Sequence, residues 1–255
     1  MEYLISAWTD IGIRKQTNQD SVSVKKINTK YGEIVFAVLC DGMGGLSNGE
    51  LASAEVVGAF NDWVYRRLPQ LCMTGINENE IIQQWNNIVQ NMNAKIMNYA
   101  QSNGVNMGTT VAVALITQSR YYIMNVGDSR VYEISDNLRR ITNDHTVVAQ
   151  KVRMGRITEE EALRDPQRNV LLQCVGASED VKPEFYFGDS RPDVCYMLCS
   201  DGLIHEVTAQ ELVSVLSPQV LNSKENITNN LQYVTELVKS RGETDNISSA
   251  LIRTK

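Results

Sequence analysis

Short apolar runs with the composition of β-strands recur from one end of the chain to the other. They are rich in Val, Ile, Tyr and Thr, and Gly, Asp or Asn bounds most of them, which is typical of strands in a sheet. We expect strands over residues 2–8, 21–27, 33–40, 110–117, 121–127, 130–135, 184–187, 194–200 and 246–252. Only Gly127, Asp128 and Ser129 separate Tyr121–Val126 from Arg130–Ser135, so we expect these two to be neighbouring antiparallel strands.

Long segments with a helical period divide these strands into groups. Two helices are expected after the third strand, and the second has one apolar face, made by Ile81, Trp85, Ile88, Val89, Met92, Ile96 and Tyr99. The asparagines between Asn77 and Asn98 mostly occupy its other face. Asn222–Arg241 repeats the apolar pattern. Because each helix must bury one stripe, we expect both to cover a sheet, in an α+β layered domain rather than a doubly wound parallel one.

The composition is that of an ordinary globular protein: 255 residues, 43% hydrophobic and 21% charged. Its net charge of −6 argues against generic binding of nucleic acid. The longest unbroken apolar runs, Ile34–Cys40 and Val111–Ile116, are too short to span a membrane. The first residues show no basic region followed by a long apolar stretch, so we expect no secretory signal. No Pro/Gly/Ser linker divides the chain. We therefore expect one cytoplasmic domain that binds neither nucleic acid nor membrane.

Four aspartates lie at the ends of these apolar runs. Asp41, Asp128 and Asp201 follow a run, and Asp245 precedes one. Each taken singly is more simply a turn residue, because Asp is common in turns, but four together are harder to explain that way. A carboxylate at the end of a buried strand is costly to desolvate unless a cation compensates. If these strand ends lie side by side, they predict a site for Mg²⁺ or Mn²⁺.

Glycines follow the first of these aspartates. Gly42, Gly44 and Gly45 let the backbone bend sharply and let its carbonyl oxygens approach an ion. A dinucleotide-binding loop is the rival interpretation, but Ser47 stands where the third glycine of G-x-G-x-x-G should be. The sequence also contains no G-x-x-x-x-G-K-[ST] motif, which excludes a Walker-type nucleotide site.

The histidines and cysteines offer little support for a nucleophilic mechanism. Neither His145 nor His205 lies in the context of a Ser-His-Asp triad, so we expect each to be a surface or hydrogen-bonded residue. The cysteines are odd in number and form no C-x-x-C pair, which predicts buried thiols rather than disulfides or a structural zinc site.

Six short motifs occur together, in a fixed order, across nearly the whole chain. They are Asn18-Gln19-Asp20-Ser21, Asp41-Gly42-Met43-Gly44-Gly45, Gly108-Thr109-Thr110, Val126-Gly127-Asp128-Ser129-Arg130, Ser200-Asp201-Gly202-Leu203 and Thr244-Asp245-Asn246-Ile247-Ser248. In this the chain resembles the metal-dependent protein serine/threonine phosphatases of the type 2C (PPM) class, in their short bacterial form. The resemblance implies a four-layer α-β-β-α sandwich, in which helices flank two packed antiparallel sheets, as a single domain over residues 1–255 with a flap at about 144–175.

The resemblance also assigns roles to particular residues. It implies that Asp41 bridges two metal ions, Mn²⁺ or Mg²⁺, and that the carbonyl oxygen of Gly42 binds one of them. Asp201 and Asp245 would bind the other ion, and Asp20 would orient a metal-bound water without touching the metal. Asp128, together with Asp201, would form a third, weaker metal site. Asp20, Asp41, Asp201 and Asp245 are thus the expected catalytic residues.

The implied reaction is the direct hydrolysis of phosphoserine and phosphothreonine on proteins. A hydroxide that bridges the two ions would attack phosphorus in line, without a covalent enzyme intermediate. The family commonly has Arg five residues before Asp20; here Lys15 stands there with Arg14 beside it, so either one is a candidate to hold the phosphate. Met43 replaces a histidine that some members carry as a general acid, so the leaving group must be protonated by water or another residue.

The segment expected to form the flap carries a local excess of positive charge. Residues 139–168 hold seven Lys and Arg against five Asp and Glu, and Thr158 with Glu161 predicts a capped short helix. The excess could select phosphoprotein surfaces, or the charges could simply be solvated. Asp165 stands where the family usually has His before Pro166, so contacts of the flap would differ here.

Phosphoproteins, as substrates of a serine/threonine kinase, are the expected partners of a monomeric enzyme. A binding module that keeps the fold without activity is the main alternative, but every carboxylate position of the expected metal site is filled. Nucleotide binding ranks third.

Overall fold

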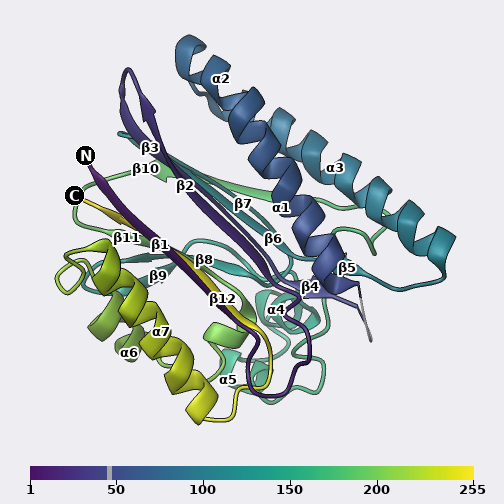
Figure 1. Cartoon of the computed structure of the whole chain (residues 1–255). Helices are drawn as coiled ribbons and strands as arrows, with labels where there is room; N and C mark the ends of the chain where they lie inside the picture. Colours follow the sequence, from purple (N-terminus) through teal and green to yellow (C-terminus); the bar gives the residue numbers. More distant parts are fainter. Residues whose placement is uncertain (45–47) are drawn as a thin grey trace.

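Two five-stranded antiparallel sheets pack face to face, and helices cover the outer face of each (Figure 1). The computed structural model describes residues 1–44 and 48–255, so Gly45 and Ser47 of the expected glycine loop lie outside the described residues. The first sheet runs in the order β1 (Tyr3–Asp10), β12 (Ile247–Thr254), β11 (Cys195–Cys199), β8 (Arg130–Ile134) and β9 (Leu138–Arg140). The second runs in the order β10 (Glu184–Asp189), β7 (Arg120–Val126), β6 (Val111–Ile116), β3 (Gly32–Cys40) and β2 (Ser21–Thr29).

The helices form two outer layers and one excursion. Over the second sheet lie α1 (Gly49–Arg66), α2 (Leu68–Thr74) and α3 (Glu78–Asn103), and over the first lie α6 (Ala209–Leu216) and α7 (Lys224–Ser240) (Figure 1). Between β9 and β10 the chain forms α4 (Val147–Arg153) and α5 (Glu159–Ala162), and a 3₁₀ turn, η1 (Asp201–Leu203), follows β11. The predicted α+β sandwich of four layers is confirmed. The predicted strands all form, and a short pair is added, β4 (Gly42–Met43) with β5 (Gly108–Thr109).

Strand β3 shows why the layers form, because it is buried on both faces. Val35, Ala37 and Leu39 point into the core between the two sheets, and alternate residues of the strand point toward α1 and α3. Successive side chains of a strand face opposite sides, so an unbroken apolar run requires cover on both. On the helix side Phe36 lies 5.7 Å from Trp63 between ring centroids. The apolar run therefore fixes β3 at the centre of the fold.

The apolar face of α3 differs from the prediction at two positions. Tyr99 is 42% exposed, whereas Asn93 is 4% exposed and lies within the buried face. The Asn93 amide donates to the carbonyl oxygen of Ser178 at 2.9 Å and accepts from the N–H of Gly176 at 2.6 Å. These bonds satisfy a buried polar group and tie α3 to the segment that leads into β10. Asn93, a polar residue within the apolar face of this helix, therefore makes tertiary contacts instead of facing solvent.

The expectation that β7 and β8 pair with each other is wrong. β7 belongs to the second sheet and β8 to the first, so the chain passes from one sheet to the other at Gly127–Ser129. Gly127 has φ +100°, and a Cβ atom there would lie 2.6 Å from Thr110 Cγ2. Only glycine suits both the left-handed backbone and the contact. The crossing carries Asp128 to the end of the sandwich where both sheets meet.

The strand ends that carry the other aspartates lie at that same end. β2 and β3 pair with Ser21 opposite Cys40, which brings Asp20 beside Asp41 at the edge of the second sheet. In the first sheet Cys199 pairs with Ser249, which brings Asp201 close to Asp245. The antiparallel registers thus gather aspartates that are far apart in sequence, as the strand-end pattern predicted.

The other expectations concern thiols and membranes. Cys40, Cys174, Cys195 and Cys199 are buried, Cys72 is partly so, and no disulfide joins the cysteines, all of which lie in the described ranges. In the part of the chain that the structure describes, no helix has the length and apolar character required to cross a bilayer.

Candidate active site

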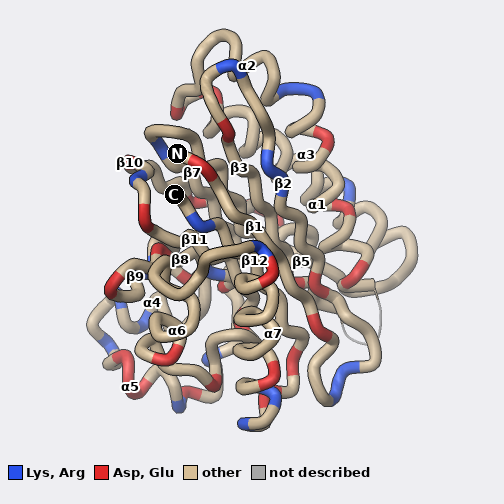
Figure 2. The backbone as a smooth tube through the Cα atoms, turned by 60° about the vertical axis from the view of Figure 1, so that its left-hand side comes forward, with Lys and Arg blue, Asp and Glu red and all other residues tan. Residues whose placement is uncertain are grey.

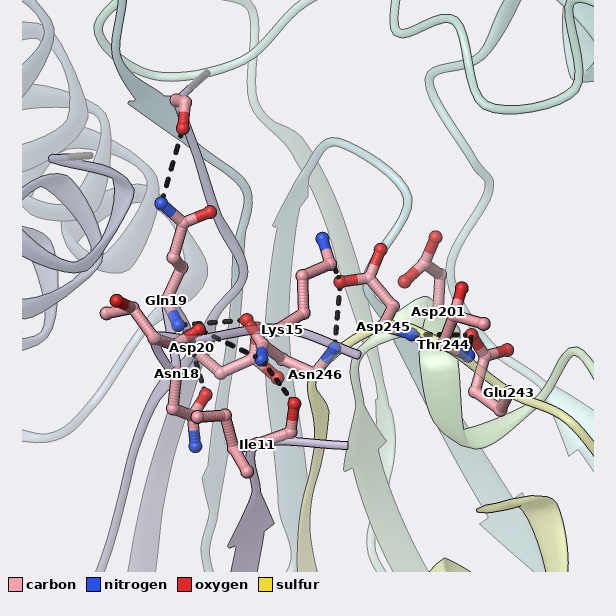
Figure 3. A network of polar contacts seen from close by, with 12 residues as sticks. Ile11, Lys15, Asn18, Gln19, Asp20, Asp201, Glu243, Thr244, Asp245 and Asn246 are labelled. Carbon is pink, nitrogen blue, oxygen red and sulfur yellow. Dashed lines mark hydrogen bonds and ion pairs between the residues drawn. The ribbon is translucent and has the colours of Figure 1, made fainter. Parts of the chain in front are cut away.

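Five aspartates, Asp20, Asp41, Asp128, Asp201 and Asp245, lie at the common end of the two sheets; we call them the acidic cluster. Their charges act on one another: Asp20, Asp201, Asp128 and Asp245 all raise the pKa of Asp41 in addition to the effect of its burial. Figure 3 shows Asp20, Asp201 and Asp245 together with the polar residues around them. Sequence reasoning chose these five positions, and the fold brings them together.

Asp20 is the most deeply buried member of the cluster. Its side chain is 8% exposed, and neither carboxylate oxygen has a hydrogen-bond partner of normal geometry. Burial and the nearby Asp201 and Asp245 raise its pKa to about 7, while the hydroxyls of Ser248 and Ser200 act in the opposite direction. Buried polar groups normally find partners, so two unpaired oxygens indicate that this site is built for a group other than the protein.

Asp41, Asp128 and Asp201 are partly accessible to water but have protein on most sides. Burial, followed by Asp201 and Asp144, raises the pKa of Asp128 to about 7. Burial also raises the pKa of Asp201, although His205 opposes the shift. Oδ1 of Asp201 is buried without a hydrogen-bond partner. Each carboxylate therefore destabilises the charge of its neighbours, and the cluster would be relieved by a cation.

The threonines of the Gly108-Thr109-Thr110 motif hold the backbone of Asp41. The N–H of Asp41 donates to Thr110 Oγ1 at 2.9 Å, and its carbonyl oxygen accepts from the Thr110 N–H and the Thr109 hydroxyl, both at 2.9 Å. The Thr110 hydroxyl also lies 2.6 Å from that of Ser129, the residue after Asp128. One buried threonine therefore connects the segments that carry Asp41 and Asp128.

Gly42 is packed too tightly to carry any side chain. A Cβ atom there would lie 2.2 Å from the carbonyl oxygen of Gly49 and 2.4 Å from that of Gln19. The N–H of Gly42 donates to the same Gln19 oxygen at 3.1 Å. This close packing explains why a glycine follows Asp41. It does not test whether the Gly42 carbonyl oxygen binds a metal ion, which stays a prediction.

Lys15 and Arg14 are both exposed, and Lys15 forms an ion pair with a carboxylate of the acidic cluster. Lys15 Nζ lies 2.7 Å from Asp245 Oδ1, and Figure 3 shows the side chain pointing at that carboxylate. Although burial opposes the shift, Asp245, Asp41 and Asp201 raise the pKa of Lys15. An ammonium group of this chain thus already faces three of the five carboxylates.

Two residues beside the cluster were not among the predicted site residues. His205 Nδ1 lies 3.1 Å from Glu243 Oε2, and His205 Nε2 lies 3.6 Å from Asp201 Oδ2. The hydrogen bond to Glu243 and the charge of Asp201 raise the pKa of His205, against the effect of burial. The spacing of four residues between Asp201 and His205, about one helical turn, is the signal that could have found the pair.

The two ends of the segment expected to form the flap are joined to each other, and the first end is bonded to Gly127, the residue before Asp128. Leu172 N–H donates to the His145 carbonyl at 2.7 Å, and Thr146 and Leu171 form an antiparallel bridge. Thr158 and Glu161 form the predicted capping box of α5. Figure 2 shows acidic and basic residues mixed around α4 and α5.

The residues present fit divalent metal ions. The donors are carboxylate oxygens, which hard cations prefer, and three buried oxygens of Asp20 and Asp201 have no protein partner. Among the described residues, no three or more His, Cys, Asp or Glu side chains are arranged closely enough to hold a metal ion as they stand. Like charges repel, which is a physical reason for ionised carboxylates to keep apart when no cation lies between them.

The comparisons with known proteins agree with this geometry. The sequence model of the family Protein phosphatase 2C matches residues 13–239. The serine/threonine phosphatase stp of Listeria monocytogenes is 32% identical, over 96% of this chain and 93% of that protein. The solved Streptococcus agalactiae serine/threonine phosphatase is 30% identical, covers all of both chains and has a TM-score of 0.84. The catalytic domain of the phosphatase PstP, solved with two manganese ions, is 27% identical over 98% and 97% of the two chains, with a TM-score of 0.78.

The family match covers most of the chain, and the matched relatives align over nearly their whole length. The six motifs, the two-sheet sandwich and the gathered aspartates point the same way. The chain belongs to the protein phosphatase 2C family.

Proposed function

We propose that this chain removes phosphate from phosphoserine and phosphothreonine in proteins by direct hydrolysis at the acidic cluster. Its family makes it a protein serine/threonine phosphatase and implies dependence on metal ions. The observation that carries the mechanism is the set of buried, unpaired oxygens on Asp20 and Asp201 within a cluster of mutually repelling carboxylates. Such a cluster is stable in its ionised form only beside added positive charge.

Each member of the cluster has a proposed role. Asp41 and the Gly42 carbonyl would hold one Mn²⁺ or Mg²⁺, and Asp41, Asp201 and Asp245 would hold a second. Asp128 with Asp201 would hold a third, weaker ion. When bound, the two main ions would offset the charge of the phosphate and supply hydroxide near neutral pH for attack in line on phosphorus. Asp20 would accept hydrogen bonds from the attacking water and orient it.

Two further features support hydrolysis without a covalent enzyme intermediate. Burial raises the pKa of the Cys199 thiol to about 12, and burial together with Asp20 and Asp41 raises the pKa of the Cys40 thiol well above its ordinary value, so neither is an available thiolate. Met43 cannot transfer protons, so water or another residue would protonate the serine or threonine oxygen that leaves. We propose that Lys15 rather than Arg14 holds the phosphate, because its ammonium group already faces the cluster.

The same proposal extends to the rest of the chain. Residues 1–255 would act as one monomeric catalytic domain, with residues 144–175 as a flap beside the site. The mixed charges around α4 and α5 suit recognition of particular phosphoprotein surfaces better than general attraction to anions. The substrates would be proteins that a serine/threonine kinase phosphorylates.

Phosphate release from a phosphothreonine peptide tests the function. The purified chain should turn over the peptide with Mn²⁺ and stop when EDTA is added. Activity that survives EDTA would refute the metal-dependent mechanism. A chain that binds the phosphopeptide but releases no phosphate with Mn²⁺ or Mg²⁺ would instead be a binding module.

A further inference from the structure

We propose that His205 and Glu243 are positioning residues that set the distance between Asp201 and Asp245 and thereby the affinity of the site for metal. The inference rests on the proposed function. Asp201 follows β11 and Asp245 precedes β12, so the two carboxylates belong to separate loops at the end of one strand pair. The backbone hydrogen bonds between β11 and β12 end where the strands end, so other contacts have to hold the two loops in place.

Glu243 fixes the loop that carries Asp245. The side chain is 7% exposed, and its Oε1 accepts the N–H groups of Thr244 at 2.6 Å and Asp245 at 2.8 Å. Two backbone bonds to one carboxylate oxygen hold the turn directly before β12. The second oxygen, Oε2, is then free to face another residue, and it faces His205. Glu243 and Asp245 are drawn in Figure 3.

His205 connects this loop to Asp201. An ionised carboxylate only accepts hydrogen bonds, so His205 Nδ1 donates to Glu243 Oε2, at 3.1 Å. The other ring nitrogen, Nε2, lies 3.6 Å from Asp201 Oδ2. The imidazole thus lies between the carboxylates of Glu243 and Asp201 and orients the Oδ2 side of Asp201. The other oxygen, Oδ1, has no protein partner and is the one left for a cation.

This bridge would act on metal affinity through geometry. Asp201 and Asp245 repel each other, as the effect of Asp245 on the pKa of Asp201 indicates. Side chains that hold the ligands of a metal are typically worth ten- to a hundredfold in metal affinity. Loss of the bridge should therefore weaken metal binding while the sheets, whose cores lie elsewhere, remain folded.

Titration of the metal-free protein with Mn²⁺, followed by calorimetry, tests the inference. His205→Ala should weaken Mn²⁺ binding about tenfold, with a metal-free melting temperature close to that of the wild type. His205→Asn, whose Nδ2 can donate to Glu243 in place of Nδ1 but which has no group in place of Nε2 beside Asp201, should show a similar loss of affinity. Arg241→Gln is the matched control: Arg241 connects Glu206 and Glu211 to the same loop at 2.7 and 3.0 Å but does not contact the acidic cluster. It should bind Mn²⁺ like the wild type.

Wild-type affinity in His205→Ala or in His205→Asn, or equal weakening in Arg241→Gln, would each overturn the inference. If His205→Ala does not fold, Glu243→Gln replaces it, with the same expected loss, and wild-type affinity there would overturn the inference too. The double variant His205→Asn with Glu243→Gln should lose no more than Glu243→Gln alone, because the residues act as one unit; additive losses would count against it. If the wild type itself binds no Mn²⁺, the proposed function fails rather than the bridge.

Discussion

Buried carboxylates occur in two neighbouring regions of the molecule, and the protein treats them in opposite ways. In the acidic cluster, oxygens of Asp20 and Asp201 lack a hydrogen-bond partner of normal geometry. In the second region, beside strand β8, the carboxylate of Asp144 forms ion pairs with Arg130 at 2.6 Å and Arg140 at 3.4 Å. Glu133 of the same strand is 3% exposed and paired with Arg139 at 3.0 Å and Arg191 at 2.5 Å. The two regions therefore differ in where the compensating charge comes from.

This difference in pairing indicates a structural role for Asp144 and a chemical role for the acidic cluster. A buried charge pair is costly to break, because the remaining partner is left without compensation. A buried carboxylate without a partner is costly as it stands and is relieved by protonation or by a cation. Asp144 should therefore contribute to stability, whereas the acidic cluster should reduce the stability of the metal-free protein in exchange for its ability to bind ions.

The largest expected difference is in the acidic cluster. Asp41→Asn and Asp201→Asn should each reduce phosphate release with Mn²⁺ on the order of a thousandfold, because a ligand of the proposed ions is lost. The metal-free melting temperature should stay the same or rise, since like charges repel less. Asp62→Asn, at an exposed position on α1, is the control and should change neither quantity. Near-normal turnover in either cluster variant would refute the assignment of the metal site.

Asp144→Asn should show the opposite pattern. Because Arg130 and Arg140 would lose their partner, the free energy of unfolding should fall by about 3 kcal/mol. Urea denaturation of the metal-free protein measures the change. Asp189→Asn removes a more exposed partner of Arg120, 3.5 Å away, and should cost less than about 1 kcal/mol. Equal effects of the two substitutions would mean that burial does not distinguish these pairs.

The pH dependence of stability should distinguish the regions further. Asp20 and Asp128 each have a pKa of about 7 in the folded chain against an ordinary value of 3.8. The folded state therefore holds more protons than the unfolded state between these values, so stability falls as the pH rises through about 7. Metal-free protein should melt about 5 °C lower at pH 8 than at pH 5.5.

Saturating Mn²⁺ provides the matching control for this pH effect. The ion binds the ionised carboxylates, so it should remove or reverse the decrease in melting temperature. A metal-free protein whose melting temperature rises steadily from pH 5.5 to pH 8 would contradict the expected coupling among the carboxylates.

The smallest expected effect concerns Lys15, the positively charged side chain beside the acidic cluster. Lys15→Met should raise the KM for a phosphothreonine peptide about fivefold, which corresponds to about 1 kcal/mol, with kcat within about twofold. The ion pair with Asp245 is about 40% exposed on both sides, so little stability should be lost. Arg14→Met is the control for loss of a nearby positive charge. A larger increase in KM for Arg14→Met than for Lys15→Met would reverse the assignment of the phosphate anchor.

Local patterns predicted most of the fold. The alternating or continuous apolar runs located the nine main strands, and the helical period located α3 and α7. These patterns could not show which strands pair. β7 and β8 are neighbours in sequence but lie in different sheets. The left-handed backbone of Gly127 lets the chain cross from one sheet to the other instead of forming a hairpin. Short elements such as β4 and β9 were not predicted, since two or three residues carry no period.

The candidate site was predictable in its acidic members and not in its supporting ones. Asp41 and Asp201 stand out because a charge directly follows an apolar strand. His205 has only its spacing of four residues from Asp201 as a local signal, and the role of Glu243 depends on a 3.1 Å contact between loops 38 residues apart. Thr110 likewise acts through its bonds to Asp41 and Ser129.

By itself, the sequence determined which segments are strands or helices and which residue types are available at their ends, because apolar period and turn chemistry are local properties. The tertiary structure alone decided which carboxylates receive an arginine and which do not. Asp144 and Asp128 both lie in polar stretches near β8, yet Arg130 pairs with the first while the second faces other carboxylates. Charge compensation depends on distances of a few ångströms between remote segments, and only the packing of the two sheets sets those distances.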